Sequence, residues 1–171
     1  LSAGLGFFRN GFPVIQMAEL TGQLEQRAKA MPEKNALALF GEDKTLSADL
    51  SEPQKHTFEW SELQDNVLRE KMGMLDLLYQ YLKTARDSKT GTSLIYRILS
   101  LIQDAEKEGR ISIARLAYVL GRLEPSNNAS EGVKSQYRAI SQALYQWAMR
   151  PEDRRALETA INLQIYKRRG A

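Results

Sequence analysis

Residues 34–41 have the sequence KNALALFG, in which the apolar run 36–40 lies between a lysine–asparagine pair and a glycine. A short, uninterrupted apolar run of this kind is typical of a buried β-strand. Residues 1–8, LSAGLGFF, predict a second buried strand, whose glycines would let another group approach the backbone closely. Between the two strands we expect a helix that starts near Pro13 and ends before Pro32. Its apolar face comprises Val14, Met17, Ala18, Leu24 and Ala28.

This strand–helix–strand segment is only half of a sheet. It cannot cover both of its own faces, so we expect further strands or a partner to complete it. The chain also opens on Leu1 rather than on a methionine, which favours a piece of a larger protein. The polar stretch 41–59 lacks periodicity, and we expect it to form an exposed loop with His56 on the surface. We therefore predict a first domain over residues 1–59.

Residues 60–171 predict a second domain, a bundle of about five helices joined by short loops. Ser61 begins a capping-box pattern, S-x-x-Q, ahead of a long helix that we expect to break at residues 89–91, KTG. Pro151 predicts the start of the last helix. The apolar stripes are Leu68, Met72, Leu75, Leu78 and Leu82; Ile95, Ile98, Leu99 and Ile102; Ile113, Leu116, Ala117 and Leu120; and Val133, Tyr137, Ile140, Leu144 and Trp147. The expected fold class is therefore α+β, mostly α.

The composition excludes several kinds of site. The 171 residues include no cysteine and a single histidine, so a disulfide framework, a thiolate nucleophile and a Cys- or His-rich metal site are all ruled out. No apolar run approaches the roughly 20 residues of a membrane span, and we expect no membrane partner. The net charge of +3 is the sum of two parts of opposite charge. Residues 1–59 carry 6 basic and 8 acidic residues, whereas residues 60–171 carry 18 basic and 13 acidic residues. We find no self-sufficient catalytic set of residues.

Two lines of basic and aromatic residues lie at helical spacing in the predicted bundle. Arg115, Tyr118 and Arg122 stand roughly opposite the apolar stripe of their helix. The second line comprises Lys134, Arg138, Ser141 and Tyr145. Arginine and tyrosine at this spacing can bind phosphates and stack on unpaired bases. The alternatives are a solvated charged face or an ordinary protein interface.

The first domain resembles the end of the second Palm domain of the type III CRISPR–Cas large subunit, with most likeness to the III-A (Csm) form. The resemblance rests on the order S-A-G, F-P, L-E-x-x-A-K, K-N-A-L-x-L-F-G and F-x-W. The matching residues are Ser2, Ala3, Gly4, Phe12, Pro13, Leu24, Glu25, Ala28, Lys29, Lys34, Asn35, Ala36, Leu37, Phe40, Gly41, Phe58 and Trp60. Such a Palm domain is ferredoxin-like and similar to nucleotidyl cyclases, so the resemblance implies an α+β sheet domain.

The resemblance also implies a nucleotide pocket. Ser2 and Gly4 would lie near ATP, and Lys29, Lys34 and Asn35 would face its triphosphate. A lysine ammonium suits phosphate oxygens, although lysines at the end of a surface helix are more often simply solvated. The metal-binding Gly-Gly-Asp-Asp hairpin of the family is absent from this sequence. We therefore expect no catalytic residue and no metal ligand here, and no cofactor bound by this chain alone.

The helical part resembles the domain that follows the second Palm domain in the same family. The similar phrases are S-L-I-Y-R, R-I-S-I-A-R-L-A-Y-V-L-G-R and A-I-N-L-Q-I-Y-K-R-R-G. The family is implied to make cyclic oligoadenylates from ATP with Mg²⁺ or Mn²⁺ once target RNA is bound, and many members cut single-stranded DNA through an HD domain, in antiviral defence. The implied partners are other subunits of a type III complex, guide RNA and target RNA, and the implied location is cytoplasmic.

Two other interpretations remain open on the sequence. The chain would be a non-enzymatic helical adaptor or a small-subunit-like module that binds RNA or proteins without nucleotide chemistry. It would otherwise be a fragment in which only the helical bundle is native. The two strands discriminate between the adaptor and the Palm assignment. The Palm assignment requires residues 1–8 and 36–40 to pair as central strands beside a nucleotide, whereas disordered or solvent-facing strands would favour the adaptor.

Overall fold

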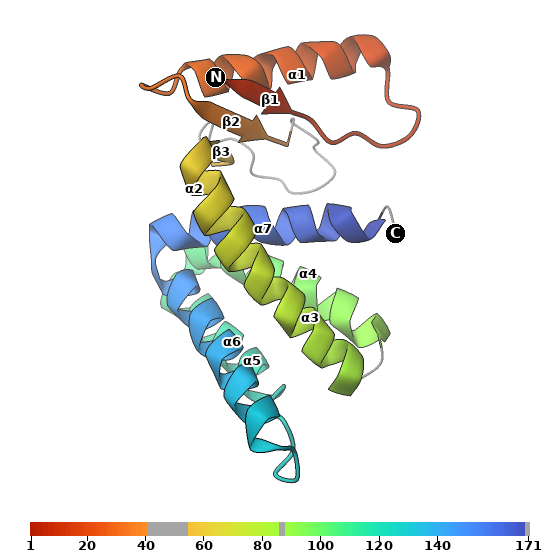
Figure 1. Ribbon diagram of the computed structural model, residues 1–171, viewed down its shortest axis with the longest axis vertical. Coiled ribbons are helices and arrows are strands. Elements are labelled where there is room, and N and C mark those ends of the chain that lie inside the picture. The colour runs from red at the N-terminus through yellow and green to blue at the C-terminus, as the bar shows by residue number, and fades with distance from the viewer. Residues whose placement is uncertain (41–54, 86–87, 170–171) are drawn as a thin grey trace. The chain divides into compact units, whose positions relative to one another are not determined.

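The computed structural model describes residues 1–40, 55–85 and 88–169 (Figure 1). The chain divides into two compact units, Leu1–Asn66 and Val67–Ala171. The division falls between Asn66 and Val67, inside a continuous helical stretch. The predicted domain boundary at residue 59 stays a prediction. Helices dominate and a small sheet accompanies them, which confirms an α+β fold that is mostly α. That the sheet is the end of a Palm domain stays a prediction.

The first unit contains a three-stranded sheet in the order β1-β2-β3. The strands are β1 (Ala3–Leu5), β2 (Ala36–Leu39) and β3 (Thr57–Glu59). β1 and β2 are parallel, with Ala3 opposite Leu37, and β2 and β3 are antiparallel. The parallel pair requires a crossover, which the helix α1 (Val14–Lys29) supplies. The predicted strand–helix–strand order is thus confirmed. The prediction that residues 1–8 form a buried strand is wrong, because β1 lies at the edge of the sheet and Leu5 is 45% exposed.

The helix α1 lies along the sheet, as Figure 1 shows. Small side chains on both elements allow this close approach. The buried cluster between them comprises Leu24 and Ala28 of α1 and Ala36 and Ala38 of β2, with Met31 packed at its edge. Because alternate strand residues share one face, Ala36 and Ala38 both point toward the helix. Alanine at both positions leaves room for the helix backbone to approach.

The third strand and the burial of His56 correct the expectation of an exposed loop over residues 41–59. Residues 55–59 are described, and β3 pairs there with β2. The Leu39 amide donates to the carbonyl of His56 at 3.0 Å, and the imidazole meets the ring of Phe40 edge-on at 5.1 Å. His56 is therefore only 6% exposed. A three-residue strand carries too little periodicity for the sequence to reveal it, and the rest of the predicted loop, 41–54, lies outside the described residues.

One helical stretch follows the sheet directly. It consists of α2 (Trp60–Glu62), the π-helical segment η1 (Leu63–Met72) and α3 (Gly73–Ala85). The predicted capping box at Ser61 is wrong, because Ser61 lies inside the helix, which begins at Trp60. The N-cap residue is Glu59, and its side chain makes no capping hydrogen bond. The antiparallel pairing of β3 ends at Glu59, so the strand geometry rather than a serine hydroxyl sets this helix start.

The remaining helices are α4 (Ser88–Glu108), α5 (Arg110–Gly121), α6 (Glu131–Met149) and α7 (Pro151–Arg169). The predicted break at residues 89–91 is wrong, because α4 already includes them. The amides of the first helical turn have no intrahelical acceptor in any helix. Poor helix formers in this turn therefore cost the helix little stability. Pro151 does start α7, as expected.

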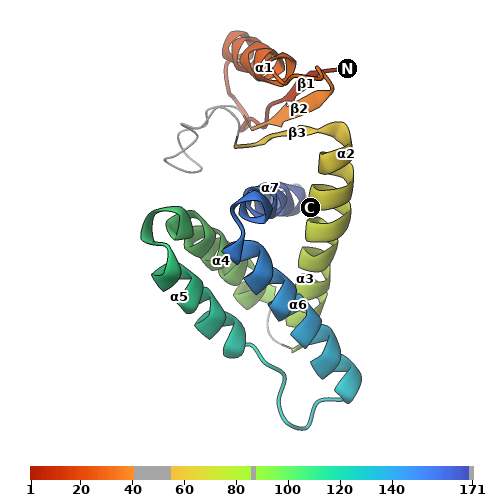
Figure 2. The same ribbon diagram turned by 90° about the vertical axis from the view of Figure 1, so that its left-hand side faces the viewer.

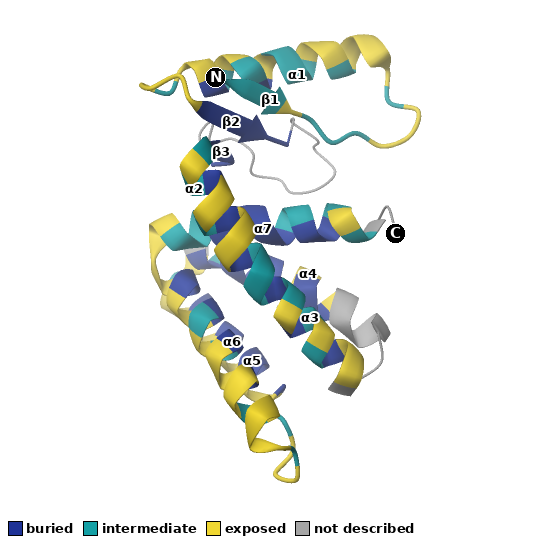
Figure 3. Ribbon diagram, in the orientation of Figure 1, coloured by how far each residue is buried: buried dark blue, intermediate teal, exposed yellow. Residues whose placement is uncertain are grey.

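The helices bury one continuous apolar core within the second unit. α4 packs against α3, α5 and α7, and α6 packs against the same three helices (Figure 2). Blue stripes in Figure 3 mark the buried faces. The central residues include Leu75, Leu78, Leu82, Ile98, Ile102, Leu116, Leu120, Ile140, Leu144, Leu157 and Ile161. The apolar periodicity correctly identifies most of the buried residues of α3 to α6. It is wrong at Leu68, Ala117 and Val133, which are exposed at the borders of their stripes, and in α1 at Val14 and Ala18, which are also exposed.

Candidate functional site

The structure joins two of the predicted nucleotide-pocket residues, Ser2 and Lys34. The Ser2 hydroxyl donates to the main-chain carbonyl of Lys34 at 2.8 Å, where the short turn between α1 and β2 ends. Lys34 has a φ of 48°, a left-handed conformation that residues with a β-carbon rarely adopt. Its side chain is exposed, and so is that of the next residue, Asn35. An ammonium and an amide are thus presented together at the start of β2.

Gly4 allows the close approach to the backbone that the sequence predicted, and the structure shows that the approaching group is α1. A β-carbon at this position would lie 2.6 Å from the Glu25 amide nitrogen and 2.7 Å from both the Leu24 β-carbon and the Thr21 carbonyl oxygen. Glycine is therefore required for β1 to approach α1. Its predicted place beside a nucleotide stays a prediction, and its close neighbour in this structure is a helix.

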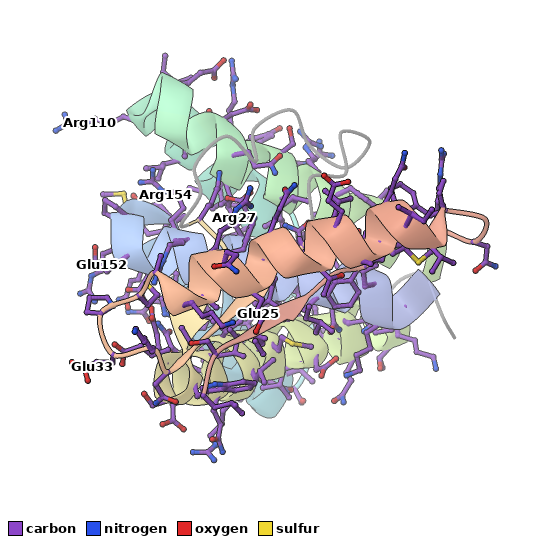
Figure 4. The ribbon with its side chains drawn as sticks, turned by 90° about the horizontal axis from the view of Figure 1, so that it is seen from above. Glu25, Arg27, Glu33, Arg110, Glu152 and Arg154 are labelled. Carbon is purple, nitrogen blue, oxygen red and sulfur yellow. The ribbon has the colours of Figure 1, made fainter. Side chains whose placement is uncertain are left out.

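Lys29 already has an anionic partner. Its ammonium lies 2.8 Å from the Glu25 carboxylate, one turn earlier on α1, and both side chains are about half exposed at 48% and 45%. Figure 4 labels Glu25 on this helix. An exposed pair of this kind is worth only a few tenths of a kcal/mol, so a phosphate could displace Glu25 at little cost.

A groove of about 390 Å³ lies between α4 and α5. Tyr118 and Arg122 border it, as does Arg97 of α4, which the sequence analysis did not single out. The Arg122 guanidinium lies over the Tyr118 ring at 5.9 Å. Arg97 follows Ser93 by one helical turn, and this i, i+4 spacing opposite the apolar stripe is the signal that could have identified it. The groove is lined by Ser93, Leu94, Arg97, Tyr118, Val119, Arg122 and Leu123.

A second groove of about 410 Å³ lies between α5 and α6. Arg138, Ser141 and Tyr145, from the predicted second line, all border it. The α5 side contributes small residues and the carboxylate of Glu124. Arg138 thus shares its groove with an acid, so this groove is less suited to a polyanion than the α4–α5 groove.

The other two predicted contact residues are held in ion pairs at the surface. Arg115 lies 2.9 Å from the Glu108 carboxylate, and Lys134 lies 3.0 Å from that of Glu131. Neither borders a groove described above. Their positive charges are therefore locally balanced. The partner of Lys134 lies three residues earlier on the same helix and follows from helical spacing, whereas that of Arg115 does not, because Glu108 belongs to the preceding helix.

The bundle also contains a buried ion pair. Lys71, in η1, has no exposed surface, and its ammonium lies 3.0 Å from Asp153 at the start of α7 and 4.7 Å from the centre of the Trp147 ring. The side chain of Asp153 is 18% exposed and also faces Arg150 at 3.8 Å. Three helical segments, η1, α6 and α7, meet at this ammonium. The ammonium also lies 3.2 Å from the Glu70 carboxylate, so this buried charge is paired with two acids and serves the packing of the bundle.

A second acid ties α3 to the end of α7. Asp76 accepts hydrogen bonds from Gln164 at 2.6 Å and Lys167 at 3.1 Å, and Arg168 lies 3.7 Å away. Burial by itself raises the pKa of the Asp76 carboxyl, but these hydrogen bonds and positive charges outweigh burial and hold the pKa below its usual value of 3.8. Asp76 therefore remains ionised at neutral pH.

Metal and membrane features are missing from the part of the chain that the structure describes. In residues 1–40, 55–85 and 88–169, no three His, Cys, Asp or Glu side chains gather as metal ligands would. None of the helices in these ranges combines the length and apolar character needed to cross a bilayer.

Comparison with known proteins gives a consistent result. Residues 79–170 match the model of the family described as the CRISPR RNA silencing complex Cmr2 subunit, second helical domain. Three curated relatives are named CRISPR system single-strand-specific deoxyribonuclease Cas10/Csm1 (subtype III-A). The relative from Mycobacterium tuberculosis is 32% identical over 171 residues, covering 99% of this chain and 18% of the relative.

The other two relatives give similar values. The protein from Streptococcus thermophilus is 29% identical over 168 residues, covering 98% of this chain and 20% of the relative. The protein from Enterococcus italicus is 32% identical over 170 residues, covering 99% of this chain and 18% of the relative. The chain thus spans about a fifth of the length of the curated relatives it matches. The similarity extends over both units, including the strands.

Proposed function

Because this chain belongs to the family of type III CRISPR large subunits, we propose that it serves as the sheet end and helical domain of such a subunit, with the α4–α5 groove contacting single-stranded RNA. The observation that carries the proposal is the pairing of Arg97 and Arg122 with the exposed ring of Tyr118 around one groove. Guanidinium groups bind phosphates, and a tyrosine that is 63% exposed offers a free face for stacking.

The floor of the groove favours a nucleotide over a simple anion. Leu94, Val119 and Leu123 line it and are each buried beneath the surface. An apolar floor between two guanidiniums suits a ligand that has both a flat apolar base and a charged phosphate. Arg115 and Lys134 are weaker candidates because Glu108 and Glu131 already balance them, and Arg138 shares its groove with Glu124.

The salt dependence of RNA binding tests this proposal. In the full-length subunit within its complex, Arg97→Ala and Arg122→Ala should each lower the slope of log Kd against log salt by about 0.7. Tyr118→Ala should weaken binding while leaving the slope unchanged, because stacking releases no counterion. Lys83→Ala, which removes an exposed charge from α3, is the matched control. Unchanged slopes in both arginine variants would contradict the RNA contact and favour a protein-binding adaptor.

For the sheet unit we propose that Lys34 and Asn35 face the triphosphate of an ATP molecule in the full-length subunit. The support is the family resemblance together with their exposed, adjacent side chains at the start of β2. The ATP would carry Mg²⁺ or Mn²⁺ and supply the nucleotide for cyclic oligoadenylate synthesis, and the metal ligands would come from outside this sequence.

Thermal shift of the intact subunit with ATP and magnesium tests this assignment. ATP should stabilise the wild type more than Lys34→Ala, because the variant lacks the ammonium that contacts phosphate. Equal stabilisation would remove Lys34 from the pocket. We expect the isolated 171-residue chain to make no oligoadenylate and to cut no single-stranded DNA, and detection of either product would contradict that expectation.

A further inference from the structure

The turn that presents Lys34 is fastened on both sides by hydrogen bonds from distant parts of the chain. We propose that Ser2 and Trp60 are positioning residues that hold this turn, and that the Ser2 hydroxyl serves Lys34 rather than the nucleotide. The proposal rests on the proposed nucleotide role of Lys34, and it reassigns Ser2, which the family resemblance places beside ATP.

The backbone conformation of Lys34 is the reason that a fastening is needed. A φ of 48° is unfavourable for a residue with a β-carbon and persists only where the surroundings enforce it. The Lys34 amide donates to the Met31 carbonyl at 3.0 Å, which closes the turn from inside. The Ser2 hydroxyl then donates to the Lys34 carbonyl at 2.8 Å, from a residue 32 positions away.

Trp60 holds the other side of the same turn. Its backbone amide donates to the Asn35 carbonyl at 3.2 Å, and its indole N–H donates to the Leu1 carbonyl at 2.8 Å. The indole thus anchors the residue before Ser2, while the backbone of Trp60 anchors the residue after Lys34. We call these three hydrogen bonds, from Ser2 to Lys34, from Trp60 to Asn35 and from Trp60 to Leu1, the clasp.

The clasp commits the Ser2 hydroxyl to a carbonyl acceptor. A serine hydroxyl has only one hydrogen to donate, and at 2.8 Å the Lys34 carbonyl takes it. Its second carbonyl neighbour, that of Ala28, lies at 3.4 Å and competes for the same hydrogen. A direct hydrogen bond from Ser2 to a phosphate would therefore release the turn that carries Lys34.

Nucleotide affinity of the full-length subunit separates a positioning role from a direct contact. ATP affinity should be measured for the wild type, Ser2→Ala, Lys34→Ala and the double variant. Ser2→Ala should weaken binding about two- to tenfold. The double variant should bind no more weakly than Lys34→Ala alone, because a positioning residue acts only through the group that it positions. Additive losses would show that Ser2 contacts the nucleotide itself and would overturn the proposal.

Hydrogen exchange of residues 31–37 without ATP tests the clasp independently of the pocket. Ser2→Ala and Trp60→Phe should both speed exchange there, whereas Ser2→Thr keeps the hydroxyl and should leave it near wild type. Thr84→Ala, which removes a hydroxyl bonded to the Gln80 carbonyl in α3, is the control. Unchanged exchange in both test variants overturns the clasp. If Ser2→Ala and Trp60→Phe exchange faster but Lys34→Ala keeps full ATP affinity, the clasp is upheld and the nucleotide role of Lys34 is refuted.

Discussion

Replacement of Gly4 by alanine should destabilise the sheet unit, because β1 and α1 lie too close for a β-carbon. The added atom would lie 2.6 Å from the Glu25 amide nitrogen and 2.7 Å from the Thr21 carbonyl oxygen, both of which belong to the helix backbone. Relief requires α1 to move as a body, and overpacking of this kind costs about 1–3 kcal/mol. Alanine regains about 0.4–1 kcal/mol by restricting the unfolded chain. The net loss should be about 1–2 kcal/mol.

Native-state hydrogen exchange is the suitable assay, since a chain with two units need not unfold in one step. The amides of Leu39 and Phe40, which donate to His56 and Leu5 in the sheet, should exchange about 5–30-fold faster in Gly4→Ala. Gly22→Ala is the matched control, because no heavy atom from outside its own helical turns lies within 4 Å of the added β-carbon. Alanine also favours a helix over glycine by up to about 1 kcal/mol. Slower exchange in Gly4→Ala would refute the close packing of β1 on α1.

Three further changes test the helical unit. Lys71→Met should lower the free energy of unfolding by about 2–4 kcal/mol by leaving Asp153 without its buried partner, and Lys71→Met with Asp153→Asn should recover part of that loss in urea unfolding. Asp76→Asn should destabilise the unit at neutral pH, and since the folded pKa is lowered the difference should vanish as the pH falls through and below about 4. Tyr137→Phe should cost about 1 kcal/mol through loss of the hydroxyl bond to the Leu120 carbonyl, and no change in its melting temperature would contradict that bond.

The main elements could be predicted because their signals are local. The apolar run at 36–40 and the glycines at residues 4 and 6 indicated paired strands, and a period near 3.6 residues indicated each helix of the bundle. The short strand β3 could not be predicted in this way. Thr57–Glu59 becomes a strand because the exposed edge of β2 accepts it, and that pairing also buries His56, which local polarity placed at the surface.

Local sequence signals predict the candidate sites only in part, as they do the strands. Tyr118 lies on α5 and Arg122, one turn later, is the residue that caps the end of this helix, so their shared face followed from the sequence. Arg97 joins them only because α4 packs beside α5. The partner of Arg115, Glu108, likewise comes from the neighbouring helix, and its carboxylate removes Arg115 from the strongest candidates. Side chains that belong to one site but to separate elements are brought together by packing, and no spacing within a single helix records it.

By itself, the sequence determined the α+β class, the identity of the buried faces and the family resemblance, because hydrophobic periodicity and short ordered motifs are properties of neighbouring residues. Only the tertiary structure decided which group approaches Gly4, that Arg115 pairs with Glu108 of the neighbouring helix, and how the turn at Lys34 is held. The first and the last of these depend on distances between residues far apart in the chain, such as Ser2 and Lys34 or Trp60 and Leu1. Such distances exist only after β1, α1 and β2 have packed together.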